Sequence, residues 1–437
     1  NFVDRLPDAA RLAERAYRVT PRDGGGDATL RAQLLLATMW VLIGRHDDAR
    51  RCLGNWVPGP RTVVSATHVL SGEYPYVVQT LARLGRYRDA ARLLELLKQA
   101  CDRESVPTAK AYLLTVDAEM LIWRGRWATA LAVAAQASEL AELTGRTALT
   151  GFIRATTARI HASRGDAEQC REDADAALTV AHLTGIRGMR VYAHAALGLS
   201  ALSAGGPEAA VAELLEADAV RRDCGLRDPA TVPFAADLIE ALAQAGETAR
   251  ARSVLAEHAG LAERSGTAWA CAVMARCAAL LQTNPDQADA QFAQAVRLHP
   301  PEVPFDLART RLCWAEHRLR RGDAGGARAL LSAALSVFFF LQATPWATRA
   351  RAAMRACGDI PPPVAGPSLA ALSAQEHNCA VAIAEGKSNR QVATALFISP
   401  KTVEYHLSKI YAKLGINSRT QLTRIVLTAQ HDPSQPS

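Results

Sequence analysis

Apolar and polar positions along most of the chain follow one repeated pattern. An apolar helical segment ends at a glycine with one or two polar residues, and a second helical segment carries a small residue five positions after that glycine. Six copies have glycines 40 or 41 residues apart, at Gly44…Ala49, Gly85…Ala90, Gly125…Ala130, Gly165…Cys170, Gly205…Ala210 and Gly246…Ala251. Looser copies follow at 284–286 and at Gly322…Ala327.

Each feature of this unit has a physical reason. A glycine after the first helix adopts the left-handed conformation that other residues resist. A small side chain five positions later lets two antiparallel helices approach closely. One helix pair cannot bury its apolar face alone, so neighbouring pairs stack into a solenoid. The pattern predicts an array that resembles tetratricopeptide repeats (TPR) but has a period longer than their roughly 34 residues; the alternative is an irregular helical bundle.

The same phase extends backwards to the start of the chain. It places Asp4 where the glycine belongs and Ala9 at the small position, so residues 7–19 are expected to be the second helix of a pair. Its partner helix would precede Asn1, and the sequence is therefore expected to be a fragment of a longer protein. Residues 1–358 form the predicted repeat domain.

Composition supports an all-α fold. Alanine, leucine and arginine, which are strong helix formers, are abundant, whereas aromatic residues make up only 5% of the chain. The nine cysteines are scattered without a CxxC pair, which favours buried thiols in a reducing cytoplasm over disulfides or a zinc site. Seven aromatic residues could line an effector groove or simply pack in the core: Tyr74, Tyr76, Trp123, Trp127, Tyr192, Trp269 and Trp314.

A proline-rich stretch at 359–367 separates the array from a different module. Four prolines between residues 361 and 367 exclude a helix and predict a semi-rigid linker. Beyond it, residues 387–424 contain seven lysines and arginines against one acid, Glu404. This charge fits a phosphate-binding surface or an ordinary solvated face.

Capping signals divide residues 368–432 into four predicted helices. Ser373 with Glu376 and Ser388 with Gln391 are two capping boxes. Ser399 followed by Pro400 predicts the start of a third helix, which Gly415 ends, and a fourth helix is expected after Ser418. A short helix, a tight turn and a long helix form a helix-turn-helix layout over about 388–408, and residues 433–437 are expected to be a disordered tail.

The third helix of this module, residues 400–414, is predicted to recognise DNA. Val403, Leu407, Ile410 and Leu414 form its core stripe. Lysines and arginine opposite or beside that stripe suit phosphates, threonine hydroxyls suit phosphates as well, and Glu404 either accepts from a cytosine or complements the helix dipole. Tyr405 either contacts a thymine methyl or shields the helix. The DNA-binding candidates are Lys401, Thr402, Glu404, Tyr405, Ser408, Lys409, Lys413, Arg419 and Thr420.

Residues 372–420 resemble the LuxR-type (GerE-type) DNA-binding domain, from Leu372-Ser373-Ala374-Gln375-Glu376 through Lys401-Thr402-Val403-Glu404-Tyr405-His406-Leu407 to Asn417-Ser418-Arg419-Thr420. The resemblance implies sequence-specific binding of double-stranded DNA by a dimer at an inverted repeat. It also implies pairing through the last helix, where Leu422, Ile425 and Val426 would make dimer contacts; alternatively they pack only in their own core. The first helix departs from the family at Gln375, Asn378, Cys379 and Ala380, so a less tightly tied helix is expected.

Residues 307–358 are similar to the segment before this domain in large ATP-binding LuxR regulators of the maltose-regulon-activator type. That similarity implies an ATPase domain before Asn1 that would bind ATP, and repeats that sense a small-molecule or protein effector. No cofactor is expected in the present chain. The protein is expected to be a transcription regulator that acts as an activator, and RNA polymerase is expected as a further partner.

Other functional classes find little support in the sequence. Gly386-Lys387-Ser388 lacks the earlier glycine and preceding strand of a phosphate-binding loop, and we find no catalytic constellation, so an enzyme is not expected. We expect a cytoplasmic protein without membrane helices, because no apolar run reaches the length that spanning requires. The alternative function is a TPR-like interaction scaffold with a non-functional helix-turn-helix domain.

Overall fold

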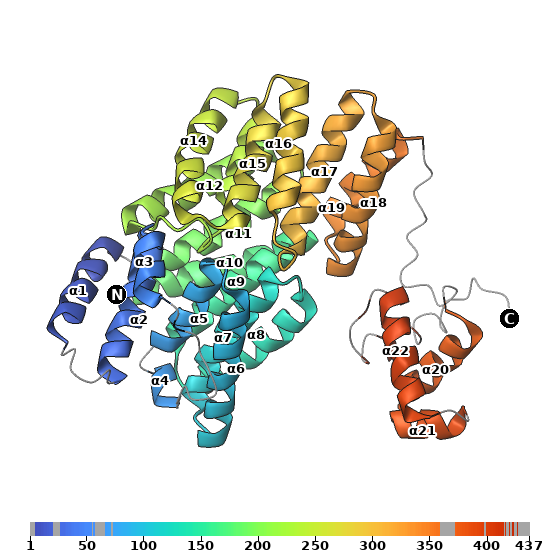
Figure 1. Ribbon diagram of the computed structural model, residues 1–437, viewed down its shortest axis with the longest axis horizontal. Coiled ribbons are helices and arrows are strands. Elements are labelled where there is room, and N and C mark those ends of the chain that lie inside the picture. Colours follow the sequence, from blue (N-terminus) through green and yellow to red (C-terminus); the bar gives the residue numbers. More distant parts are fainter. Residues whose placement is uncertain are drawn as a thin grey trace. The chain divides into compact units, whose positions relative to one another are not determined.

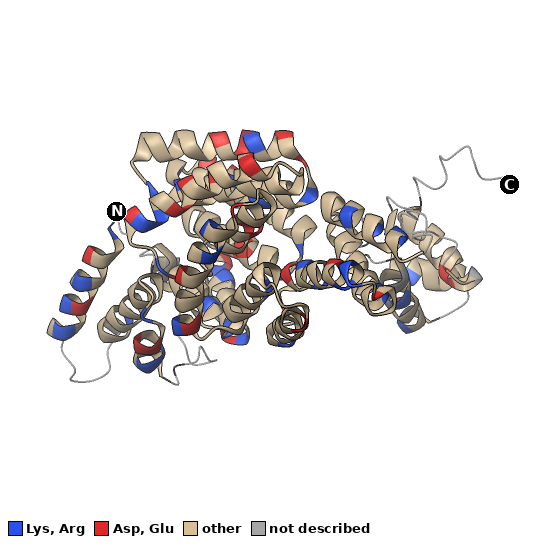
Figure 2. Cartoon of the chain, turned by 90° about the horizontal axis from the view of Figure 1, so that it is seen from above, with Lys and Arg blue, Asp and Glu red and all other residues tan. Residues whose placement is uncertain are grey.

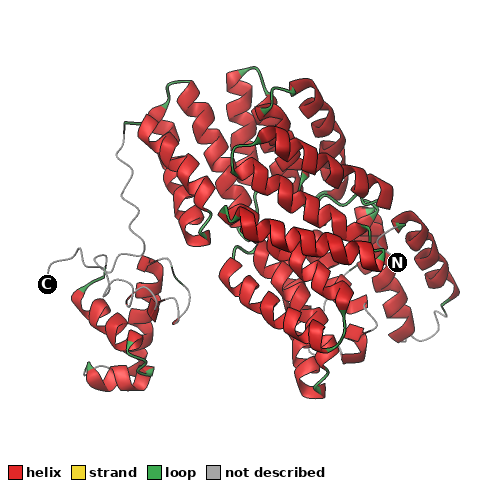
Figure 3. Ribbon diagram, turned by 180° about the vertical axis from the view of Figure 1, so that it is seen from behind, coloured by secondary structure: helices red, strands yellow, loops and turns green. Residues whose placement is uncertain are grey.

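The computed structural model describes residues 5–20, 27–54, 56, 66–70, 73–358, 372–396, 399–414, 416, 419, 422, 423 and 426. Within these residues it contains 22 helices and no strand (Figures 1 and 3). The predicted all-α fold is therefore confirmed. Two compact units, Asn1–Gly358 and Asp359–Ser437, divide the chain at the end of the predicted repeat domain. The predicted linker at 359–367 and tail at 433–437 lie outside the described residues.

The first unit is a succession of antiparallel helix pairs, in which most consecutive helices contact one another. After a first helix, α1 (Leu6–Val19), the helices are α2 (Asp27–Leu42), α3 (His46–Leu53), α4 (Ala66–Leu70), α5 (Glu73–Arg83), α6 (Tyr87–Glu104), α7 (Pro107–Trp123), α8 (Trp127–Leu143), α9 (Thr147–Arg164), α10 (Ala167–Thr184), α11 (Gly188–Ser203), α12 (Pro207–Cys224), α13 (Ala235–Gln244), α14 (Thr248–Ser265), α15 (Ala268–Leu281), α16 (Pro285–Leu298), α17 (Pro304–Arg320), α18 (Ala324–Leu341) and α19 (Thr344–Ala356).

The repeated glycines do what the pattern predicts. Every one of them has a positive φ angle, including 83° at Gly165 between α9 and α10. The small residue five positions later is buried throughout, as Cys170 and Ala210 illustrate. The backbone amide after each turn glycine returns to the preceding helix, as Asp166 does to the carbonyl of His161 at 3.0 Å. The repeat prediction is confirmed at the level of single turns.

A second series of left-handed turns, which the sequence analysis did not identify, explains the long period. Between the pairs, Gly145, Gly185, Gly225 and Gly266 have positive φ, and Ser105 adopts the same conformation at 51°. Helices α9 and α10 are each 18 residues long. Two such helices with two short turns account for the spacing of about 40 residues.

The array curves back on itself, so that early repeats pack against late ones. Helix α3 contacts α14, and α9 contacts α19. Arg164 donates to the carbonyl oxygen of Leu341 at 3.2 Å across 177 residues of sequence. His46 and Asp228, 182 residues apart and both fully buried, lie 2.9 Å apart. The first unit is thus closed by contacts between repeats about 180 residues apart in sequence.

A network of buried charged side chains lies within this closed array. Arg309 contacts Asp237 at 2.5 Å and Glu240 at 2.8 Å, and all three side chains are almost fully buried. Arg349 on α19 reaches the other oxygen of Glu240 at 2.8 Å. Burial alone would raise the pKa of Glu240, but Arg309 and Arg349 outweigh it and lower the pKa to about 2. Helices α13, α17 and α19 are therefore tied together by charge.

The expectation that no segment is long and apolar enough to cross a membrane does not hold for helix α18. It is long and apolar enough to do so by length and composition alone. In the first unit, however, Leu331, Leu335 and Phe338 of this helix are buried in a hydrophobic cluster with Phe305 and Trp346. One face of α18 is therefore part of the core of the array, while Phe339 and Phe340 on it are 42% and 44% exposed.

Candidate nucleic-acid interface

The second unit contains three helices whose starts are fixed by side-chain caps. They are α20 (Ala374–Ala384), α21 (Asn389–Ala395) and α22 (Pro400–Leu414). Ser373 and Glu376 form one complete capping box, and Ser388 and Gln391 form another. Before α22, the amide of Thr402 donates to the hydroxyl of Ser399 at 3.1 Å. The three predicted helix starts are confirmed.

These helices pack around one small core. The predicted stripe on α22, Val403, Leu407, Ile410 and Leu414, is buried at no more than 7% exposure. Cys379 and Ala380 of α20 are fully buried against it, so small side chains fill the positions where the sequence departs from the family. Helix α22 contacts both α20 and α21. This packing fixes which face of α22 is left to solvent.

The solvent face of α22 carries most of the predicted DNA-binding residues. Lys401, Glu404, Tyr405 and Lys409 are exposed, and Thr402 is half-buried. Tyr405, at 57% exposure, is the one large hydrophobic side chain exposed among the described residues of this unit. Ser408 and Lys413 lie on α22, but their side chains, like Thr420 as a whole, lie outside the described residues.

Tyr405 and Lys409 form one exposed group, one helical turn apart. The Lys409 ammonium lies 4.7 Å from the centre of the Tyr405 ring. Hydrogen bonding to Tyr405 raises the pKa of Lys409, whose ammonium is already charged at neutral pH. The pair therefore presents a cation and an aromatic face together, and it suits contact with a phosphate and a neighbouring base edge.

Arg419 lies where a structural role is favoured over a phosphate contact. Its guanidinium donates to Asn389 Oδ1 at 3.1 Å and to the carbonyl oxygen of Lys387. Both acceptors belong to the start of α21, and the Arg419 side chain is half-buried. Because those donors are committed, Arg419 ties its own segment to α21. Lys387 is itself paired with Glu385 at 2.6 Å, so the cations of this unit are not all free for a ligand.

Two of the three residues proposed for dimer contacts lie in the core of the described unit. Leu422 and Val426 are fully buried and belong to the same cluster as the α22 stripe. This placement favours the alternative that they pack only within their own domain, since a side chain with no exposed surface cannot contact a second copy. Arg419, Leu422, Thr423 and Val426 have helical conformation, in agreement with a fourth helix, while Ile425 lies outside the described residues.

Comparison with known proteins identifies this unit. Residues 370–426 match the model of the family described as bacterial regulatory proteins, luxR family. A putative HTH-type transcriptional regulator of Mycobacterium tuberculosis is 47% identical over 51 residues, which are 12% of this chain and 6% of that protein. The uncharacterized transcriptional regulatory protein YhcZ of Bacillus subtilis is 50% identical over 50 residues, which are 11% of this chain and 23% of that protein.

The DNA-binding transcriptional activator DevR/DosR of Mycobacterium tuberculosis is similarly related, with 40% identity over 53 residues, 12% of this chain and 24% of that protein. The chain thus spans less than a quarter of the length of these three relatives. Residues 370–426 form a LuxR-family helix-turn-helix domain.

The repeat unit has more distant likenesses among solved structures. A Rap protein crystallised with competence and sporulation factor has a TM-score of 0.47 and 11% identity, over 81% of this chain and 97% of that one. Human IFIT1 bound to a capped RNA has a TM-score of 0.38 and 12% identity, over 98% and 95% of the two chains. The helical repeat is established here by its own turns and packing.

Proposed function

We propose that this chain is a sequence-specific DNA-binding transcription regulator. The observation that carries the proposal is the two-sided character of α22. Its apolar stripe is buried against α20 and α21, and its other face exposes Lys401, Glu404, Tyr405 and Lys409. A helix held in this way by a LuxR-family domain can enter the major groove with its N-terminal residues against base edges.

The proposed roles follow from chemistry and position. Lys401 and Lys409 neutralise phosphates, and their contribution to affinity is independent of sequence. Glu404 and Tyr405 in the first two turns of α22 face base edges and supply sequence preference. A dimer binding two half-sites of an inverted repeat would have to pair through surfaces other than Leu422 and Val426, since both are buried.

The wider proposal concerns regulation. We propose that the repeat unit senses an effector or partner, and that the chain activates transcription by contacting RNA polymerase. Relatives that include a DNA-binding transcriptional activator support this direction. Control by ATP through a preceding domain stays a prediction from the resemblance to the large ATP-binding regulators.

Selection of binding sites from a random DNA pool with the full chain tests the proposal. Wild type is compared at two salt concentrations with Tyr405→Ala, Lys409→Ala and a control, Lys110→Ala, whose exposed lysine lies on α7 of the repeat unit. We expect one enriched inverted repeat. Losing Lys409 should weaken binding to all sequences and lower the salt slope by about one, while losing Tyr405 should relax base preference.

The opposite result is equally clear. If no sequence is enriched and Lys110→Ala weakens binding as much as Lys409→Ala, the DNA-binding face is not on α22. The chain would then be better described as a helical interaction scaffold.

A further inference from the structure

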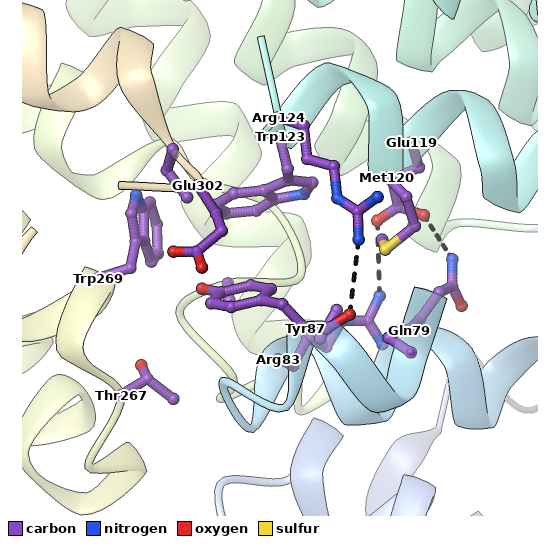
Figure 4. Close-up of a pocket in the computed structure, with 14 residues that line it drawn as sticks. Gln79, Arg83, Tyr87, Glu119, Met120, Trp123, Arg124, Thr267, Trp269 and Glu302 are labelled. Atoms are coloured by element: carbon purple, nitrogen blue, oxygen red, sulfur yellow. Dashed lines mark hydrogen bonds and ion pairs between the residues drawn. The ribbon is translucent and has the colours of Figure 1, made fainter. Parts of the chain in front are cut away.

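A cleft in the repeat unit has features of a ligand site. It has a volume of about 30 Å³, opens to solvent, and lies between α5, α6 and α7 on one side and residues 230, 267, 269, 302 and 303 on the other (Figure 4). These segments meet only because the array closes on itself. The cleft is therefore a product of the folded array and is absent from any single repeat.

Aromatic side chains form its walls. Trp123 and Trp269 meet edge to face, with ring centres 4.9 Å apart and planes at 81°. Trp269 is held in place by the hydrogen bond that its indole N–H donates to Asp306 at 2.9 Å. Tyr87, at the start of α6, supplies a third, half-buried ring. Trp269 lines the cleft although it is only 5% exposed, whereas Tyr74 and Trp127 are buried away from it, so only some of the predicted aromatic groove residues have a candidate ligand role.

The charged side chains around the cleft differ in whether the protein itself provides them with an oppositely charged partner. Arg83 lies 3.9 Å from Glu119 and 3.7 Å from Asp228, so this buried arginine faces two acids. Arg124 donates to the backbone carbonyl of Tyr87 at 3.5 Å, at the rim. Glu302 is exposed and forms no ion pair with any residue that the structure describes.

Glu302 faces the aromatic wall. Figure 4 shows its carboxylate directed toward the hydroxyl end of Tyr87, beside Trp269. In agreement, burial and the charge of Glu302 together raise the pKa of Tyr87. The cleft thus combines three aromatic rings with the carboxylate of Glu302 at the hydroxyl end of Tyr87, while Arg124 lies at the backbone end of the same residue (Figure 4).

We infer that this cleft binds a small organic cation: a protonated amine or quaternary ammonium group on an apolar body. Indole and phenol rings attract a cation through their faces, and a nearby carboxylate completes the neutralisation. At the hydroxyl end of Tyr87 an anion is disfavoured, because Glu302 would repel it there; Arg83 is opposed by two acids, and Arg124 lies at the other end of Tyr87, where it donates to the backbone carbonyl. The inference rests on the proposed role of the repeats as the effector-sensing part of the regulator.

Matched probes test this inference on the full chain. Choline carries a quaternary ammonium, and 3,3-dimethylbutan-1-ol is its uncharged isostere; phenethylamine and 3-phenylpropanoate are a similar pair of opposite charge. Tryptophan fluorescence and titration calorimetry would measure binding. We expect choline or phenethylamine to bind at least tenfold more tightly than its uncharged or anionic counterpart, because only the cation gains the ring and carboxylate interactions.

Two glutamate variants locate the site. Glu302→Gln should weaken cation binding about fivefold to tenfold, since the carboxylate charge is lost without loss of shape. Glu139→Gln, which removes an exposed carboxylate on α8 outside the cleft, should leave binding unchanged. Unchanged circular dichroism would show that both variants are folded.

Three results would overturn the inference: no binding of either cation at millimolar concentration, preference for 3-phenylpropanoate, or equal effects of the two glutamate variants. None of these measurements uses DNA. A chain that selects a DNA sequence but fails here would lose only the cation site, and a chain that binds choline but selects no DNA would lose only the proposed regulator role.

Discussion

Removing the charge of Glu240 should destabilise the repeat unit strongly. Glu240 on α13 is 2% exposed, and its two oxygens accept hydrogen bonds from Arg309 and Arg349, each at 2.8 Å. Glu240→Gln keeps the volume of the side chain but leaves the buried guanidinium of Arg309 and the half-buried guanidinium of Arg349 with one fewer negative charge. Breaking a buried ion pair by removing one partner typically costs about 3–5 kcal/mol.

Two considerations place the expected loss at the lower end of that range. Arg309 keeps Asp237, and Arg349 keeps both oxygens of Glu316 at 2.6 and 2.7 Å. The drop in the pKa of Glu240 from 4.5 to about 2 corresponds to about 3 kcal/mol, at roughly 1.4 kcal/mol per pKa unit. We therefore expect the free energy of unfolding to fall by about 3 kcal/mol.

Urea unfolding followed by far-ultraviolet circular dichroism measures this loss, with Glu247→Gln as the matched control. Glu247 is 43% exposed and pairs with Arg250 at 3.1 Å, so the control should cost less than about 0.5 kcal/mol. A loss below about 1 kcal/mol for Glu240→Gln, or equal losses for both variants, would refute the assignment of a stabilising charge network.

The pH dependence gives an independent test of the same reasoning. Because the pKa of Glu240 is lower in the folded chain than in the unfolded chain, its charge stabilises the fold above pH 4.5. That contribution is lost as the pH falls from about 4.5 toward 2. The difference in stability between wild type and Glu240→Gln should therefore shrink over this window, and a constant difference from pH 7 to pH 3 would contradict the charge argument.

Two further substitutions probe the turns and the DNA-binding unit. Gly165→Ala should lower the free energy of unfolding by more than Gly205→Ala: both glycines have positive φ, which costs other residues roughly 1–2 kcal/mol, but only at Gly165 would the added Cβ lie 2.6 Å from Pro345. Urea midpoints compare them, and equal losses would show that the contact with Pro345 relaxes freely. Arg419→Ala should lower the melting temperature of the second unit, because its bond to Asn389 is lost, without changing the salt slope of DNA binding. A slope reduced by about one would instead make Arg419 a phosphate contact.

The parts of the fold that depend on nearby residues could be predicted from the sequence. A left-handed glycine, a small residue five positions later and a serine cap each act within one or two helical turns. A short stretch of sequence therefore contains all the residues that determine the local structure. This is why the turn at Gly165, the capping boxes at Ser373 and Ser388, and the core stripe of α22 were predicted correctly. The second turn series was missed because Ser105 and Gln342 take the position of glycine in two copies.

Contacts between distant segments could not be predicted in this way. Arg419 suits a phosphate by its chemistry, and only the folded unit shows that Asn389 and the Lys387 carbonyl engage it. Leu422 and Val426 suit either a dimer contact or the core, because both surfaces are apolar. Their complete burial in the described unit favours the core, which helical periodicity alone could not do.

The position of the cleft follows from how the array closes. Gly44 approaches Arg227, Gly125 approaches Pro304 and Gly165 approaches Pro345, so turns within early pairs face turns between pairs about 180 residues later. With a period of about 40 residues, this offset is four and a half repeats, which brings a turn of one type against a turn of the other. The cleft obeys the same rule, because Tyr87 lies across from Thr267 and Trp123 lies near Val303.

The repeat pattern constrains mainly the residues on the buried helix faces. The identity of the residues at these turns is therefore less restricted. Aromatic and charged side chains can therefore collect there without disturbing the packing that repeats from pair to pair. Figure 2 shows both signs of charge distributed over the helices of the repeat unit, so net charge marks no single binding surface on it. The proposed cation site is instead formed where the array closes on itself. The closure brings three aromatic rings and the carboxylate of Glu302 together from segments that no single repeat contains.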